Sequence, residues 1–154
     1  MQLRPETRIA APIFAAIPLV LLIGATAVTF AVAHGAPTWL RLPFHLVCHQ
    51  IPTRCLVLWG VPMPLCARCV AIYVGLFAGL LSWFAIPYLE ERVMRIAMFV
   101  AATPMAVDGV TQAMRLREST NPLRLGSGLA AGTAFGLWVL TALERREGQE
   151  FTTS

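Results

Sequence analysis

The chain has 154 residues, of which 57% are hydrophobic and only 13% are charged. Globular domains carry about a quarter charged residues, so this composition excludes an ordinary soluble domain and a small secreted disulfide scaffold. We therefore expect one domain, residues 1–154, embedded in a lipid bilayer. The net charge of +4 includes no basic run or stripe, and we expect no nucleic-acid partner.

The first apolar segment, residues 9–33, contains no ionisable side chain. About 20 apolar residues cross a bilayer as a helix, so this segment is predicted to span the membrane. A cleaved signal peptide is the alternative, with Ala31-Val32-Ala33 as the cleavage site. Signal peptides have apolar regions of only about 7–15 residues, which favours a retained helix.

Three further spans are predicted at residues 66–88, 93–114 and 125–143. The connection of residues 34–65 contains several prolines and aromatic residues, so we expect it to lie at the membrane surface rather than form one helix. The predicted fold is all-α, a bundle of four transmembrane helices. With four spans, the first and third connections share one face of the membrane.

Glycines recur every four residues in two of the predicted spans. Gly75 and Gly79 lie in one span, and Gly128, Gly132 and Gly136 lie in another. Small residues at this spacing allow helices to approach closely. We expect tight helix packing here, and these seams are also candidates for association between copies of the chain.

The membrane side is only weakly indicated, because arginines are divided equally between the two sides of the predicted bundle. Cytoplasmic loops normally carry the excess of basic residues. If some arginines near the cysteines are held for function, the termini are cytoplasmic and the cysteine side is extracytoplasmic. We expect a multi-pass protein of the cell membrane, such as a bacterial inner membrane.

All four cysteines lie between residues 48 and 69. Cys66 and Cys69 are at i and i+3, on one face at the start of the second span, where the free amides of a helix N-terminus favour thiolates. Together with Cys48 and His49 they form a Cys3His set suited to tetrahedral zinc. A single helical turn would also present His45, which we interpret as an interfacial or hydrogen-bonded histidine. Small buried cysteines without chemistry are the alternative.

Asp108 is an acid inside the third predicted span, four residues before Gln112. An ionisable group at membrane depth is costly and marks a functional site by default. Asp108 is a candidate general base, a partner of a metal ligand, or a structural partner of an arginine. The side chains that would bind an anionic lipid or a small substrate are Arg54, Arg68, Gln112, Arg117, Asn121 and Arg124. Alternatively, the arginines reach the interface, and Asn121 caps the fourth span.

Four ordered motifs resemble the domain of unknown function 2085 family of small integral membrane proteins of bacteria and archaea. They read CHQxPxR from Cys48, PLCARCxxIYxGxxxG from Pro64, DGxxQ from Asp108 and RxSTNxxRxxxG from Arg117. The resemblance covers residues 45–132 and implies a multi-span membrane protein with a polar Cys/His mouth. It implies no reaction. Cys55 stands where the pattern leads us to expect serine.

Three functions remain open. The first is a membrane metal site, most simply zinc, that binds or acts on an anionic lipid or small substrate. The second is a quinone-linked thiol-disulfide oxidoreductase, similar in layout to bacterial disulfide-bond oxidases and vitamin K epoxide reductases, using Cys66 with Cys69 and Cys48 with Cys55. The third is a non-catalytic membrane subunit or scaffold.

Overall fold

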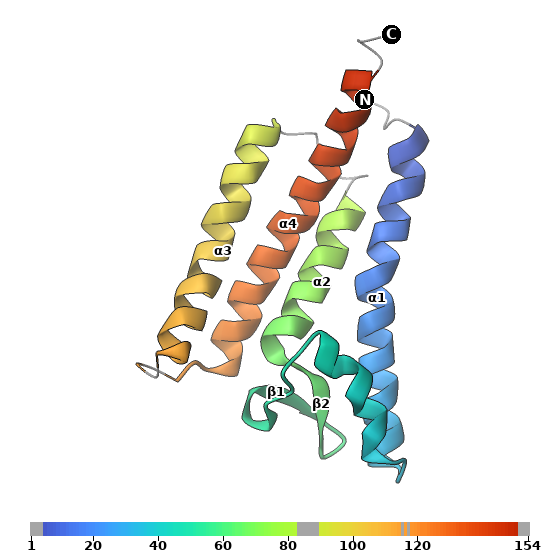
Figure 1. The fold of residues 1–154 in the computed structure, drawn as a ribbon, viewed down its shortest axis with the longest axis vertical. Coiled ribbons are helices and arrows are strands. Elements are labelled where there is room, and N and C mark those ends of the chain that lie inside the picture. Colours follow the sequence, from blue (N-terminus) through green and yellow to red (C-terminus); the bar gives the residue numbers. More distant parts are fainter. Residues whose placement is uncertain (1–4, 83–89, 115, 117, 151–154) are drawn as a thin grey trace.

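The computed structural model describes residues 5–82, 90–114, 116 and 118–150 (Figure 1). Helix α1 comprises Pro5–Ala33 and is followed by two 3-10 helices, η1 (Thr38–Leu46) and η2 (Pro52–Arg54). A two-stranded hairpin, β1 (Cys55–Leu58) and β2 (Val61–Cys66), leads into α2 (Ala67–Leu81). Helices α3 (Glu91–Ala113) and α4 (Asn121–Glu150) complete the described chain.

Three helices are long and apolar enough to cross a membrane. By length and composition, the candidate spans are Ile9–Ala33, Glu91–Ala113 and Asn121–Leu143, which correspond to three of the four predicted spans. The described part of the second predicted span is α2, with 15 residues, and residues 83–88 lie outside the part that the structure describes. Crossing a bilayer takes about 20 residues, so α2 alone is short for a span.

Helix α1 packs into the domain. Its residues Ala11 and Ala15 form a buried cluster with Leu80 of α2 and Leu140 of α4. Further along, Ala25 joins a second cluster with residues of the hairpin. The small side chains of α1 let the neighbouring backbones approach closely, as is usual between helices in a membrane. The first apolar segment therefore contributes to the core.

The prediction of an all-α fold was wrong for residues 55–66. These residues form the antiparallel hairpin, in which Cys55 pairs with Cys66 and Leu58 pairs with Val61. The turn is Trp59-Gly60, both with positive φ, 52° and 77°, a geometry that matches the twist of a two-residue hairpin. Prolines in β2 are tolerated because a two-stranded sheet consists of edge strands only.

The two glycine seams face each other between α2 and α4. A Cβ atom added to Gly75 would lie 2.4 Å from the carbonyl oxygen of Leu129, and one added to Gly132 would lie 2.3 Å from that of Ile72. The predicted tight packing is confirmed, and it occurs within one chain. Because these faces are covered, an association between copies, which stays a prediction, would use other surfaces.

The polar connections gather at one end of the helices. Figure 1 shows the hairpin, the last turns of α1 and α3 and the first turns of α2 and α4 together at its lower end. This arrangement brings the cysteine motif near the end of α3, as expected from the order of the spans. The 3-10 helix η1 lies at the same end and exposes Trp39, Leu42 and Leu46, which is typical of a segment at a lipid surface.

Candidate metal centre

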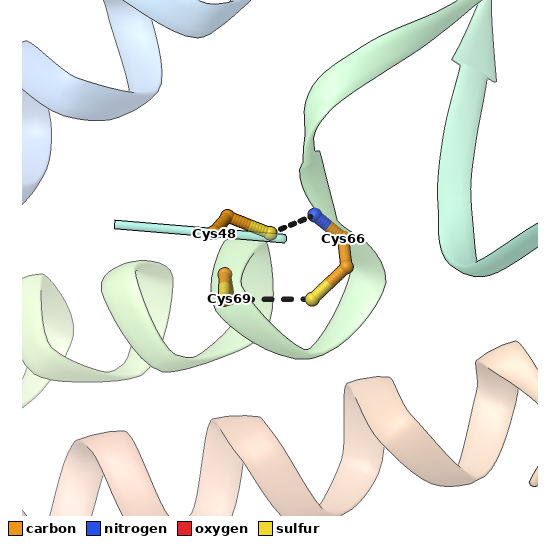
Figure 2. A group of neighbouring side chains, drawn as sticks. All are labelled: Cys48, Cys66 and Cys69. Atoms are coloured by element: carbon orange, nitrogen blue, oxygen red, sulfur yellow. Dashed lines mark hydrogen bonds between the residues drawn. The ribbon is translucent and has the colours of Figure 1, made fainter. Parts of the chain in front are cut away.

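Three of the four cysteines form a compact group. The Sγ atoms of Cys48, Cys66 and Cys69 all lie within 4.8 Å of one another (Figure 2). Cys66 is the last residue of β2 and the N-cap of α2, and Cys69 lies in the first turn of that helix. Cys48 belongs to the segment after η1 and completes the group beside the first turn of α2.

Hydrogen bonds fix the three sulfur atoms. The backbone N–H of Cys66 donates to Sγ of Cys48 at 3.1 Å, and the thiol of Cys66 donates to Sγ of Cys69 at 3.4 Å (Figure 2). The thiol hydrogen bonds from Cys66 and Cys69 lower the pKa of Cys48, and the amides of Gln50 and Cys66 lower it further, against the opposing effect of burial. Cys48 is therefore held as a thiolate, the form that binds metals.

Gln50 and Arg41 hold the segment of Cys48 in place. Gln50 is buried and has a positive φ of 53°, which reverses the chain directly after Cys48 and His49. Its Nε2 donates to the backbone oxygen of Arg41 at 2.8 Å, and Arg41 donates in turn to the carbonyl oxygen of Met63 in β2 at 3.2 Å. These bonds connect η1, the Cys48 segment and the hairpin.

The fourth cysteine lies outside the group. Cys55 is 3% exposed, and its thiol donates to the backbone oxygen of Ile51 at 3.2 Å. Burial raises its pKa to about 11, so it remains a neutral thiol near neutral pH. Cys55 is thus a buried structural cysteine, unlike the three that share the metal centre.

Neither His45 nor His49 belongs to the three-thiol group. A helical turn that would present His45, Cys48 and His49 together does not extend to His49: η1 ends at Leu46, and the amide of Cys48 closes the turn by donating to the carbonyl oxygen of Phe44. His49 is exposed and lines the cavity beside the thiols. It remains a predicted fourth ligand, whereas His45 lies on η1 and is absent from the cavity lining.

A polar network connects the cysteine motif to α3 and α4. Arg68, between the two cysteines of α2, forms an ion pair with Oδ2 of the buried Asp108. Nε2 of Gln112 donates to the same oxygen at 2.7 Å. Arg124 of α4 donates to Oε1 of Gln112 at 3.0 Å and to Oδ1 of Asn121 at 2.9 Å. The predicted arginine partner of Asp108 is therefore Arg68.

A cavity of about 340 Å³ joins the thiols to the arginines. Its lining consists of Val47, Cys48, His49, Gln50, Ile51, Arg54, Cys66, Arg68, Cys69, Gln112 and Arg124. Asp108 and Asn121 are absent from this lining and instead position the side chains that reach it. Arg117, also predicted to bind an anion, lies outside the described residues.

The sequence pattern missed Arg41 and Gln50 as supports of Cys48. A buried polar side chain next to a candidate ligand is the signal that points to Gln50, because polar residues beside metal ligands often orient them. For Arg41 no local signal exists, since its partners, Gln50 and Met63, are 9 and 22 residues away.

A family model described as "Predicted membrane protein (DUF2085)" matches residues 48–138. The chain belongs to the DUF2085 family. The matched region begins at Cys48 and includes all three thiols, Asp108 and the three arginines of the cavity, whereas α1 and η1 precede it. The resemblance of the four motifs is thereby confirmed, and the family places the chain among membrane proteins.

Two archaeal proteins are similar to this chain. An uncharacterized protein of Methanocaldococcus jannaschii is 38% identical over 99 residues, which are 63% of this chain and 64% of that protein. An uncharacterized protein of Methanothermobacter thermautotrophicus is 40% identical over 98 residues, 64% of this chain and 86% of the relative. The match thus spans less than two thirds of the first relative. No solved structure matches.

Proposed function

We propose that this protein is a multi-pass membrane protein whose second span includes α2, and that it holds a zinc ion at the membrane surface on Cys48, Cys66 and Cys69. The observation that carries the proposal is the group of three sulfur atoms within 4.8 Å of one another on the wall of a cavity. In this proposal, the ion binds an anionic ligand or substrate that enters the cavity.

The spacing of the sulfurs suits zinc. Zinc–sulfur bonds of about 2.3 Å in a tetrahedral site put the sulfur atoms about 3.8 Å apart. The three sulfur atoms of this group all lie within 4.8 Å of one another. Small side-chain movements would therefore be enough to bring them to the spacing of a zinc site. Thiolates select zinc or copper(I) over magnesium or calcium, and the deprotonated Cys48 supplies the first ligand.

The fourth position of such a site would face the cavity. Sites with three protein ligands and one open position are typical of catalytic zinc, which activates a bound water or polarises a substrate oxygen. His49 on the cavity wall is the alternative fourth ligand and would close the site. We propose that Asp108 positions Arg68 rather than acting as the base, since its carboxylate is buried and engaged by Arg68 and Gln112.

Metal analysis of the purified, reduced protein tests the proposal. We expect about one zinc per chain in the wild type. Cys55→Ser, which changes a buried cysteine outside the group, is the matched control and should retain the metal. Cys48→Ser, Cys66→Ser and Cys69→Ser should each lose most of it. Zinc should also raise the thermal unfolding temperature of the wild type and of Cys55→Ser, but not of Cys66→Ser. A metal-free wild type, or equal retention in all four variants, would contradict a zinc site.

One observation favours a second candidate, a thiol-disulfide oxidoreductase. Cys66 and Cys69 are separated by two residues and their sulfur atoms are 3.4 Å apart, close enough to form a disulfide after a small rotation. A second redox pair of Cys48 with Cys55 is not favoured, because Cys48 contacts Cys66 instead. Trapping thiols in intact membranes distinguishes the two candidates: a Cys66–Cys69 disulfide that turns over with added quinone supports oxidoreduction, and permanently reduced thiols with bound zinc support the metal site.

We also propose that the cysteine side is extracytoplasmic. A membrane-impermeant maleimide applied to intact cells, after metal removal, should then label Cys69, which is partly exposed. Labelling that occurs only after the cells are opened would place the site in the cytoplasm.

A further inference from the structure

Three guanidinium groups from separate segments surround the cavity. Arg54 belongs to η2, Arg68 to the first turn of α2 and Arg124 to the first turn of α4. All three line the same cavity, so their positive charges are gathered in one place. Among the described residues that line the cavity, none is a carboxylic acid.

Arg124 is a buried cation whose direct partners are neutral. The residue is only 6% exposed, and its two terminal nitrogens donate to the amide oxygens of Asn121 and Gln112. Its Nε is buried and has no hydrogen-bond partner among the described residues. A buried charge is costly unless an opposite charge balances it, and amide dipoles do this only in part.

Arg54 is the least engaged of the three. Within the part of the chain that the structure describes, no side-chain hydrogen bond or ion pair holds its guanidinium. It lines both the main cavity and a smaller neighbouring cavity of about 200 Å³, which also contains Glu118. Glu118 is exposed and lies outside the main cavity lining, so its charge is largely screened by water.

The charged groups around the cavity add up to a net positive charge. Asp108 balances Arg68 directly, and a divalent metal on three thiolates carries a net charge of about −1. One positive charge then remains around the cavity. An anion of one or two charges would therefore be stabilised here, and the guanidinium of Arg54, which has no side-chain partner among the described residues, can hold two of its oxygens.

We infer that the cavity binds a phosphoryl group. This inference rests on the proposed function, in which Cys48, Cys66 and Cys69 would hold a metal on the wall of the same cavity. A phosphate monoester carries about −1.5 to −2 charges and offers three terminal oxygens in a tetrahedral arrangement. Arg54, Arg68 and Arg124 line one cavity from three separate segments, so a group with three terminal oxygens can contact more of them than a planar carboxylate, which offers only two oxygens. Arginine also recognises phosphate through paired hydrogen bonds.

The phosphoryl group has two sources, a lipid headgroup and a soluble phosphate. The rim of the cavity contains Val47 and Ile51, which are 41% and 40% exposed. Apolar side chains exposed next to a basic cavity, at the end of the helix bundle, are where a phospholipid would place its acyl chains and headgroup. The same basic cavity would also admit phosphate from water, and the two sources require separate measurements.

Titration of the zinc-loaded, full-length protein in phosphatidylcholine nanodiscs tests the inference. The first arm measures binding of inorganic phosphate by calorimetry, and the second measures enrichment of phosphatidic acid around the protein in mixed nanodiscs. We expect binding in at least one arm, weakened about tenfold or more by Arg54→Gln, because one charge-assisted contact is lost. Arg124→Lys keeps the charge but loses the paired donors and should also bind more weakly.

Arg95→Gln is the matched control, since it removes an equal charge from a half-exposed arginine near the start of α3. It should bind as the wild type does, and Arg54→Gln should retain its zinc and unfolding temperature. Absence of binding in both arms to a zinc-loaded protein would overturn the inference and leave the metal site standing. Acetate bound as tightly as phosphate would also overturn it. Binding that depends on Arg54 in a protein without zinc would retain the anion site and refute the metal site.

Discussion

Because α2 packs so closely against α4, we expect a single methyl group added between them to destabilise the protein. In Gly132→Ala, the new Cβ atom would lie 2.3 Å from the carbonyl oxygen of Ile72 and 3.0 Å from its carbonyl carbon. These are backbone atoms of a neighbouring helix and cannot rotate away. The two helices must therefore separate by about 1 Å to restore an ordinary contact.

The distance by which the two helices separate determines how much the free energy of unfolding falls. A gap of that width removes about a quarter to a half of the dispersion energy of the atoms on either side, and overpacking of a core costs about 1–3 kcal/mol. Replacing a helical glycine by alanine returns about 1 kcal/mol through backbone entropy. We expect Gly132→Ala to lower the free energy of unfolding by about 2 kcal/mol, because the clash extends along the whole seam.

Gly126→Ala is the control, because the same helix offers a glycine whose added Cβ atom meets nothing within 4 Å. It should be neutral or stabilise by up to about 1 kcal/mol. Unfolding in mixed micelles of increasing SDS fraction, followed by far-UV circular dichroism, compares the two variants with the wild type. If Gly132→Ala is as stable as Gly126→Ala, the close contact between α2 and α4 is refuted.

Two further predictions concern the polar network and the fourth cysteine. Asp108→Asn leaves Arg68 without its ion pair, and since Arg68 is 22% exposed we expect a loss of about 2–3 kcal/mol in SDS unfolding, below the value for a fully buried pair. Glu91→Gln, in the more exposed pair with Arg95, should cost at most about 1 kcal/mol, and equal effects would contradict the buried network. Cys55, with a pKa raised to about 11, holds only about one thiolate in ten thousand at neutral pH. Its alkylation in the reduced, metal-free protein should rise about tenfold per pH unit between pH 7 and 10, whereas fast labelling of the folded protein at pH 7 would refute its burial.

The sequence predicted local relationships best. Cys66 and Cys69 were placed on one face at the start of a helix because an i, i+3 spacing has one outcome in a helix. The glycine seams and the shared end of the polar connections followed from spacing and from the number of spans. These predictions depend on helical periodicity, which short-range sequence patterns record directly.

The predictions that failed depend on non-local contacts or on backbone reversals. The hairpin of residues 55–66 was missed because its prolines argue against a strand, and only its turn, Trp59-Gly60, indicates two edge strands. A helical turn shared by His45, Cys48 and His49 is absent because the turn ends before His49, and the left-handed Gln50 that follows has no strong sequence signal, since only glycine signals that conformation strongly. The sequence also left open which arginine pairs with Asp108, because Arg68 is 40 residues away and reaches it only through the packing of the helices.

The seam between α2 and α4 also explains how the candidate site is assembled from distant parts of the chain. At Gly128, an added Cβ atom would lie 2.8 Å from the carbonyl oxygen of Arg68, so the two backbones touch beside the cysteine motif. Arg124 precedes Gly128 by one helical turn and is therefore brought to the first turn of α2. The first turn of α2, which carries Cys69, and the backbone of Arg124 are thus held together by direct backbone contact. This is the rigidity that a site with a defined ligand geometry requires, because loosely held groups lose binding energy when they are ordered by the ligand.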